Sequence, residues 1–177
     1  MTNTLQGEIT LVTGATRGIG AAIADELATQ GAKVIGTATS DAGAQALRAQ
    51  GAEAHRGTLE DLASLRRGAE RADGVIHAGF IHDFSKFAEN CEIDRLAIEA
   101  LADVLAGSGR PLVVTAGIPG VPGRAATEDD PPNDATPRVS EQTALAQVER
   151  QVRASVIRQP QVHDRDKAGL ASYLAAI

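Results

Sequence analysis

Residues 12–20 read VTGATRGIG, which places three glycines between an apolar run and an alanine-rich segment. The apolar run predicts a buried strand, and the spacing of Ile19, Ile23 and Leu27 predicts a helix that ends before Gly31. A glycine-rich turn between a strand and a helix lets a diphosphate approach the backbone and the free N–H groups of the helix. The stretch therefore predicts a dinucleotide site, and its alternative interpretation is a tight structural turn.

The order of strand, turn and helix repeats along the chain. Strands are predicted at 9–12, 33–37, 75–77, 112–115 and 154–157, with a weaker one at 52–55. Helices are predicted at 19–30, 41–50, 59–71, 84–106 and 139–152. This alternation predicts an α/β fold, a Rossmann-like doubly wound parallel sheet with strand order 3-2-1-4-5-6 and helices on both faces. The 177 residues are enough for a single NAD(P)-binding domain over 1–177.

Composition and charge exclude several classes of function. A net charge of -6 argues against a broad nucleic-acid-binding surface, and no apolar run approaches the roughly 20 residues that span a bilayer. The single Cys91 cannot form an internal disulfide, and the N-terminus has no basic and apolar signal segment. We therefore expect a cytoplasmic protein with a small-molecule substrate, no metal, and no nucleic-acid or membrane partner. The composition allows a homo-oligomer.

The glycine loop is predicted to contact the cofactor through six residues: Gly14, Thr16, Arg17, Gly18, Ile19 and Gly20. Gly14 would make the turn, Gly18 would allow the diphosphate to approach, and Gly20 would let the helix pack on the strand. The loop has no Gly-Lys-Ser/Thr ending, so it does not fit the phosphate loop of nucleoside triphosphatases.

The pattern T-G-x-x-x-G-I-G after a first strand resembles the short-chain dehydrogenase/reductase superfamily. The first ~45 residues resemble bacterial 3-oxoacyl-carrier-protein reductases. The stretches ALRAQGAEAHRGTLEDLASLRRGAERADGVIHAGF and ATEDDPP instead resemble the extended or atypical, epimerase/dehydratase-like branch. The two patterns meet near 39–44, which suggests a chimeric chain. The resemblance implies hydride transfer to or from a small carbonyl or alcohol, and a C-terminal substrate part that is largely missing.

The residues after the second predicted strand favour NADP over NAD. The strand ends in GTATS, without an acid before Asp41, which we interpret as the N-cap of the next helix. An acid there would bind the ribose hydroxyls of NAD and repel a 2′-phosphate. The reductases that this segment resembles use NADP, and the resemblance implies that Arg17 and Thr37 lie near its 2′-phosphate.

Two further stretches fit a nucleotide site. Thr58 and Leu59 follow the third strand, where the extended branch has Gly-Asp-Leu with the Asp reading adenine. Thr58 replaces that Asp, and a cap of the next helix explains Thr58 equally well. His77, Ala78 and Gly79 follow the fourth strand, where small residues would let the nicotinamide ribose approach, although a strand-ending turn is the alternative.

Groups for acid/base catalysis are less evident. The superfamily uses a Tyr with a Lys four residues later, and the resemblance implies an orienting role for Thr115. The one tyrosine, Tyr173, is followed four residues later by Ile177, and the expected position at 137–144 reads PRVSEQTA. Tyr-x-x-x-Lys is therefore absent. The sequence predicts an NADP(H)-binding, oxidoreductase-like protein; the alternatives are a non-catalytic NADP-binding sensor or interaction module, and a truncated or chimeric chain without activity.

Two other features remain open. The proline-rich segment 116–137 is too long for a plain connection and predicts either a substrate-side loop or a mobile segment. His82, Asp83 and Ser85 include the residue types of a catalytic triad, but nothing in the sequence sets their geometry.

Overall fold

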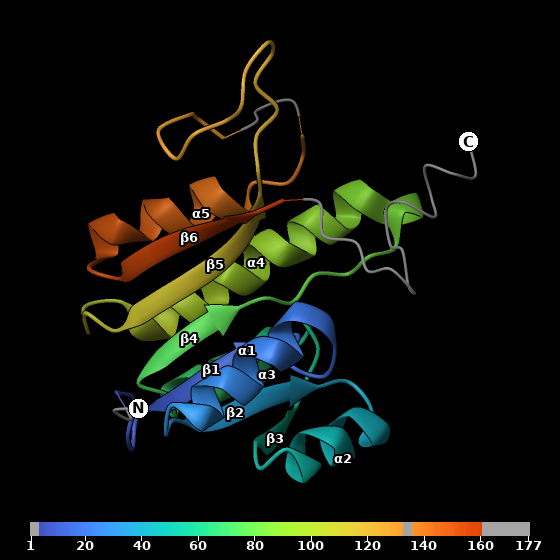
Figure 1. The fold of residues 1–177 in the computed structure, drawn as a ribbon, viewed down its shortest axis with the longest axis vertical. Helices are drawn as coiled ribbons and strands as arrows, with labels where there is room; N and C mark the ends of the chain where they lie inside the picture. Colours follow the sequence, from blue (N-terminus) through green and yellow to red (C-terminus); the bar gives the residue numbers. More distant parts are fainter. Residues whose placement is uncertain (1–3, 133–135, 161–177) are drawn as a thin grey trace.

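One parallel sheet of six strands forms the centre of the fold (Figure 1). The computed structural model describes residues 4–132 and 136–160. The strands are β1 (Ile9–Thr13), β2 (Lys33–Ala38), β3 (Glu53–Arg56), β4 (Gly74–His77), β5 (Pro111–Gly117) and β6 (Arg153–Gln159). They lie in the order β3-β2-β1-β4-β5-β6 with parallel pairing throughout, which confirms the predicted fold class and strand order.

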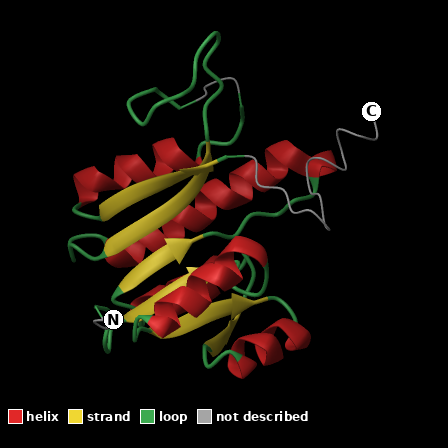
Figure 2. Cartoon of the chain, viewed as in Figure 1, coloured by secondary structure: helices red, strands yellow, loops and turns green. Residues whose placement is uncertain are grey.

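Helices cover both faces of this sheet (Figure 2). They are α1 (Gly18–Thr29), α2 (Asp41–Ala49), α3 (Leu62–Glu70), α4 (Phe87–Leu105) and α5 (Ser140–Ala146), with 3-10 turns η1 (Phe84–Lys86) and η2 (Gln147–Arg150). Leu47 of α2 packs in one apolar cluster with Val12, and Leu101 of α4 packs in a second cluster with Leu11. Because successive strand residues point to opposite faces, Leu11 and Val12 anchor helices on the two sides of one strand.

None of the helices in the described ranges is both long enough and apolar enough to cross a membrane.

The helix predicted at 59–71 begins at Leu62, because Asp61 is its N-cap. The Asp61 carboxylate accepts the N–H of Ser64 at 2.9 Å. The Thr58 hydroxyl accepts the N–H of Asp61 at 3.3 Å, so it closes the turn before the helix and does not cap the helix itself.

The sequence suggested Asp41 as the N-cap of α2, but the N-cap is Ser40. The Ser40 hydroxyl accepts the N–H of Gly43 at 3.1 Å. Asp41 is the first helical residue, where its negative charge faces the positive end of the helix dipole. The carboxylate of Asp41 therefore remains exposed beside the end of β2.

The two other long predicted helices are each divided. The segment predicted at 84–106 begins as η1, capped by the Asp83 carboxylate, and becomes α4 at Phe87. The segment predicted at 139–152 is α-helical only to Ala146 and then tightens into η2, before Gln151 turns the chain with a φ of 60°. The short α5 leaves its first residues at the carboxyl end of β5.

The connection between β5 and α5 is held at the edge of the sheet by Arg158 of β6. Its guanidinium donates to the carbonyl oxygens of Thr127, Glu128 and Asp130, and it pairs with the Glu141 carboxylate at 2.7 Å. These bonds attach the described part of the connection to β6.

Candidate dinucleotide and substrate site

The glycine loop lies between the carboxyl ends of β1, β2 and β4, where the strand order changes direction. A Cβ atom on Gly14 would lie 2.8 Å from the Cα of Gly79, and one on Gly20 would lie 2.3 Å from the carbonyl oxygen of Gly14. Gly18 has a φ of +56° and only open space where its Cβ would be. The loop is thus closely packed on its inner side and open at Gly18, which fits a diphosphate.

The N-terminus of α1 opens onto the same loop. Its first N–H groups have no acceptor within the helix, and its N-cap, Arg17, provides no side-chain hydrogen bond to them. The Gly14 N–H donates to the Thr37 hydroxyl at 3.2 Å, so Thr37 holds the loop against β2. Arg17 and Ile19 are exposed, and Thr16 lies between the loop and the start of α2. This end of α1 therefore offers free donors and one arginine.

A hollow lies at the carboxyl ends of β2 and β3. It is lined by Ala38, Thr39, Arg56, Gly57, Thr58 and Asp61. Arg56 lies opposite Ala38 in the sheet and has a 3.5 Å ion pair with the fully exposed Asp41. An exposed pair of this kind contributes little stability, so the Arg56 guanidinium is available to a phosphate.

The end of β4 is bound to the glycine loop through His77. The Thr13 hydroxyl is hydrogen-bonded to Nδ1 of His77 at 2.9 Å, and the His77 Nε2–H donates to the Asp94 carboxylate at 3.0 Å. Because a carboxylate can only accept, Nε2 of His77 carries a hydrogen. The Thr13 oxygen accepts the N–H of Gly79 at 3.1 Å. The predicted residues 77–79 therefore lie directly beside Gly14, and the Leu59 side chain covers Gly79.

The hydrogen-bond network continues from Asp94 in α4 to the start of α5. The Ser140 hydroxyl donates to the second Asp94 oxygen at 2.5 Å, and Nε of Arg138 donates to the Ser140 oxygen at 3.0 Å. His77, Asp94 and Ser140 are almost fully buried. Within the ranges 4–132 and 136–160, every buried side-chain nitrogen or oxygen has a hydrogen-bond partner. A buried polar network that is fully satisfied holds its members in one geometry.

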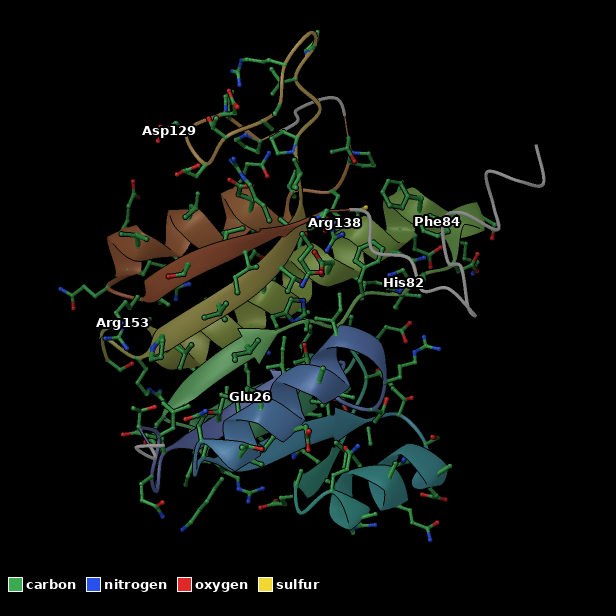
Figure 3. All side chains as sticks on the ribbon, viewed as in Figure 1. Glu26, His82, Phe84, Asp129, Arg138 and Arg153 are labelled. Carbon is green, nitrogen blue, oxygen red and sulfur yellow. The ribbon has the colours of Figure 1, made fainter. Side chains whose placement is uncertain are left out.

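Arg138 extends from this network to the carboxyl end of β5. Its Nη2 donates to the carbonyl oxygen of Thr115 at 3.2 Å, and the guanidinium carbon lies 4.3 Å from the centre of the Phe80 ring. A cavity of about 230 Å³ adjoins it, lined also by Gly117, Ile118, Thr136, Ser140 and Gln142. The Thr115 hydroxyl donates to the carbonyl oxygen of His77 at 3.3 Å, so its proton is directed toward β4. Figure 3 shows Arg138 and His82 at the same edge of the sheet.

The described part of α5 contains neither the Tyr nor the Lys that the superfamily has at these positions. Glu141 is ion-paired with β6, and Ala144 is buried in the apolar core. Pro137 has no ionisable group. Tyr173, the one tyrosine of the sequence, lies outside the described residues.

His82, Asp83 and Ser85 do not form a triad. The Ser85 hydroxyl donates to the Asp83 carboxylate at 2.6 Å, which leaves Asp83 as the cap of η1. The His82 ring packs against the rings of Phe80 and Phe84, with centroid distances of 5.5 Å and 6.2 Å. Asp83 therefore stabilises a turn, and His82 belongs to an aromatic cluster at the edge of the site.

His82 should report the arrival of an anion. Burial lowers its pKa, and the positive charges of Arg138 and Arg17 lower it further. The 2′-phosphate of NADPH beside Arg17 would offset the charge of that arginine, so we expect the pKa of His82 to rise when NADPH binds. NMR titration of the ring C–H signals, with and without saturating NADPH, measures the change. An unchanged pKa in the saturated complex would place the anion elsewhere.

The sequence analysis missed four groups of this site: Thr13, Arg56, Asp94 and Arg138. A signal was present for Asp94, which shares the buried face of α4 with Ala97, Ile98 and Leu101. A carboxylate on an apolar helix face needs a partner, so this spacing could have indicated a buried network. The other three are ordinary residue types at strand or helix ends, and their roles depend on neighbours that are distant in sequence.

Comparison with curated proteins gives two kinds of match. An uncharacterized protein of Schizosaccharomyces pombe is 41% identical over 153 residues, which is 84% of this chain and 52% of that protein. The 3-oxoacyl-[acyl-carrier-protein] reductase FabG of Escherichia coli is 71% identical over 42 residues, 24% of this chain and 17% of that protein. The chain thus spans about half the length of the longer-matching relative. A match over 84% of 177 residues includes positions on both sides of 39–44.

Solved structures share the fold. A proposed epimerase from Burkholderia cenocepacia has a TM-score of 0.72 at 20% identity, over 88% of this chain and 55% of that one. An alcohol dehydrogenase from Thermococcus sibiricus, complexed with 5-hydroxy-NADP, has a TM-score of 0.64 at 23% identity. The match covers 93% of this chain and 82% of that one. Residues 8–74 match the model of the short chain dehydrogenase family. The first part of the chain is therefore similar to the short chain dehydrogenase family, and the solved structures share the fold.

Proposed function

We propose that this protein binds NADP(H) at the glycine loop and transfers hydride to or from a small carbonyl or alcohol substrate. The observation that supports this proposal is the close packing of Gly14, Gly20 and Gly79. Because these residues have no side chains, their three backbone segments can lie in contact, while Gly18 of the same loop is open. When bound, the cofactor would supply a hydride which, with a proton, converts a carbonyl into an alcohol and leaves the oxidised nucleotide. The neighbouring T. sibiricus structure is of a complex with an NADP derivative.

The chain's own groups support the phosphorylated cofactor. No carboxylate belongs to β2, while Arg17 and Arg56 stand on either side of its carboxyl end, at the glycine loop and at the end of β3. A 2′-phosphate carries about two negative charges, and an arginine fork binds such oxygens by two parallel hydrogen bonds. Thr37 contributes indirectly by holding Gly14, and Thr58 and Asp61 form the floor of the hollow beside Arg56.

Replacing Arg17 or Arg56 with alanine tests this cofactor preference. Each variant should weaken NADPH binding by about tenfold or more and leave NADH binding within about twofold, because only the 2′-phosphate is lost between the two ligands. Titrations that follow nucleotide fluorescence measure both affinities. Arg48→Ala is the matched control, since Arg48 is an exposed residue in the last turn of α2. Equal losses for NADPH and NADH in both variants would contradict the assignment.

A second candidate function is a non-catalytic NADP-binding module, favoured by the lack of a phenol and ammonium pair in the described part of α5. Oxidation of NADPH in the presence of small ketones and aldehydes separates the two candidates. Turnover supports the oxidoreductase. Tight NADPH binding without turnover of any of these carbonyl compounds supports the binding module. No binding of either nucleotide contradicts both.

A further inference from the structure

We infer that Arg138 forms a binding site for a carboxylate, and that the substrate is a small carboxylic acid whose reacting carbonyl lies close to its carboxylate. This inference rests on the proposed function, because it names the substrate class of the same site. The first observation is that Arg138 has no ion-pair partner: in the described part of the chain, its guanidinium donates to a hydroxyl and a carbonyl oxygen and to no carboxylate. A half-buried guanidinium of this kind is a ready partner for an anionic ligand.

The acidic groups near Arg138 are already engaged. Glu141 lines the same cavity, but both of its oxygens accept from Arg158, at 3.0 Å and 2.7 Å. Asp94 accepts from His77 and Ser140 and reaches Arg138 only through the Ser140 hydroxyl. Neither acid therefore pairs directly with Arg138, although both lie close by.

The Arg138 guanidinium is held in a fixed orientation. Nε donates to Ser140, Nη2 donates to the carbonyl oxygen of Thr115, and the plane lies over the Phe80 ring. Nη1 has no hydrogen bond to the described residues, and Nη2 retains a second N–H. Nη1 and the second N–H of Nη2 are thus left as donors, and the two oxygens of a planar carboxylate can accept from them.

The position and size of the cavity indicate the kind of acid. Thr115 lies near the carboxyl end of β5 and Phe80 follows β4, so the guanidinium lies at the edge of the sheet to which the glycine loop and residues 77–79 also belong. A cavity of about 230 Å³ is smaller than the ~300 Å³ at which drug-sized ligand sites begin. A short acid would place its carboxylate on Arg138 and its carbonyl toward residues 77–79.

Binding of oxamate and oxamide to the NADPH-saturated protein tests the inference. The two probes differ in that oxamate carries a carboxylate where oxamide carries a neutral amide. Calorimetry should show oxamate binding and much weaker oxamide binding. Arg138→Gln should weaken oxamate binding by at least about tenfold and change NADPH affinity by less than about twofold. The oxamate affinity of Arg138→Lys should lie between those of Arg138→Gln and the wild type. Circular dichroism and thermal unfolding establish that the variants are folded.

Arg153→Gln is the matched control, because Arg153 is exposed and lies at the opposite end of the sheet (Figure 3). Absence of oxamate binding to the loaded protein, equal binding of oxamide, or an unchanged oxamate affinity in Arg138→Gln would each overturn the inference. A large loss of NADPH affinity in Arg138→Gln would also overturn it and would assign Arg138 to the cofactor phosphates. The NADPH affinity of the wild-type protein, measured without oxamate, tests the proposed function independently of the carboxylate site. Oxamate titration without nucleotide still tests the arginine if NADPH does not bind.

Discussion

Gly20→Ala is expected to weaken NADPH binding by a factor on the order of 100 and to lower the free energy of unfolding by about 1–3 kcal/mol. The new methyl group would stand 2.3 Å from the carbonyl oxygen of Gly14. This neighbour is backbone, so it cannot move aside by rotating a side chain. The first turn of α1 or the glycine loop must shift, and either shift displaces the N–H groups that would bind the diphosphate.

Gly120, rather than Gly18, provides the control for Gly20→Ala. Gly120 has ordinary backbone angles and no atom within 4 Å of an added Cβ, so Gly120→Ala should leave both binding and stability unchanged. Gly18 also has open space, but its positive φ costs an alanine about 1–2 kcal/mol. Fluorescence titration with NADPH and urea unfolding measure the effects. Wild-type affinity in Gly20→Ala would show that the diphosphate does not depend on this packing.

Asp94→Ala is expected to reduce the free energy of unfolding by about 2–6 kcal/mol, because it leaves two buried donors without acceptors at ~1–3 kcal/mol each. These donors are the Nε2–H of His77 and the hydroxyl of Ser140. With ~2–4 °C per kcal/mol for a chain of this length, the midpoint of thermal unfolding should fall by roughly 4–24 °C. Loss of Ser140 as a fixed partner should also release Arg138 and weaken oxamate binding.

Asp103→Asn is the matched control on the same helix. Asp103 is exposed, and its ion pairs with Arg66 and Arg150 lie at the surface, where such pairs contribute about 0–1 kcal/mol. Asp94→Asn keeps one acceptor oxygen and should lie between wild type and Asp94→Ala in stability. A thermal midpoint for Asp94→Ala equal to that of Asp103→Asn would show that the buried network does not stabilise the fold.

The fold and the glycine loop could be predicted because both depend on local patterns. Apolar runs such as 9–12 and 75–77 are too short for helices, and their alternation with helical segments leaves few sheet topologies. Glycines at 14, 18 and 20 have roles that follow from their spacing after a strand. Element ends were less predictable: Asp61 and Thr58 compete as caps three residues apart, and only the backbone geometry decides between them.

The sequence was sufficient to predict a doubly wound sheet, which the structure confirms, to predict a nucleotide loop at 12–20, and to show that the given residues contain no Tyr-x-x-x-Lys. Tertiary contacts were needed to find the Arg138 guanidinium at the carboxyl edge of the sheet. Arg138 is linked to His77 through Ser140 and Asp94, residues that are 46 positions apart in the chain. Hydrogen bonds between such distant residues depend on how α4 and α5 pack over the sheet, and periodicity along the sequence does not encode that packing.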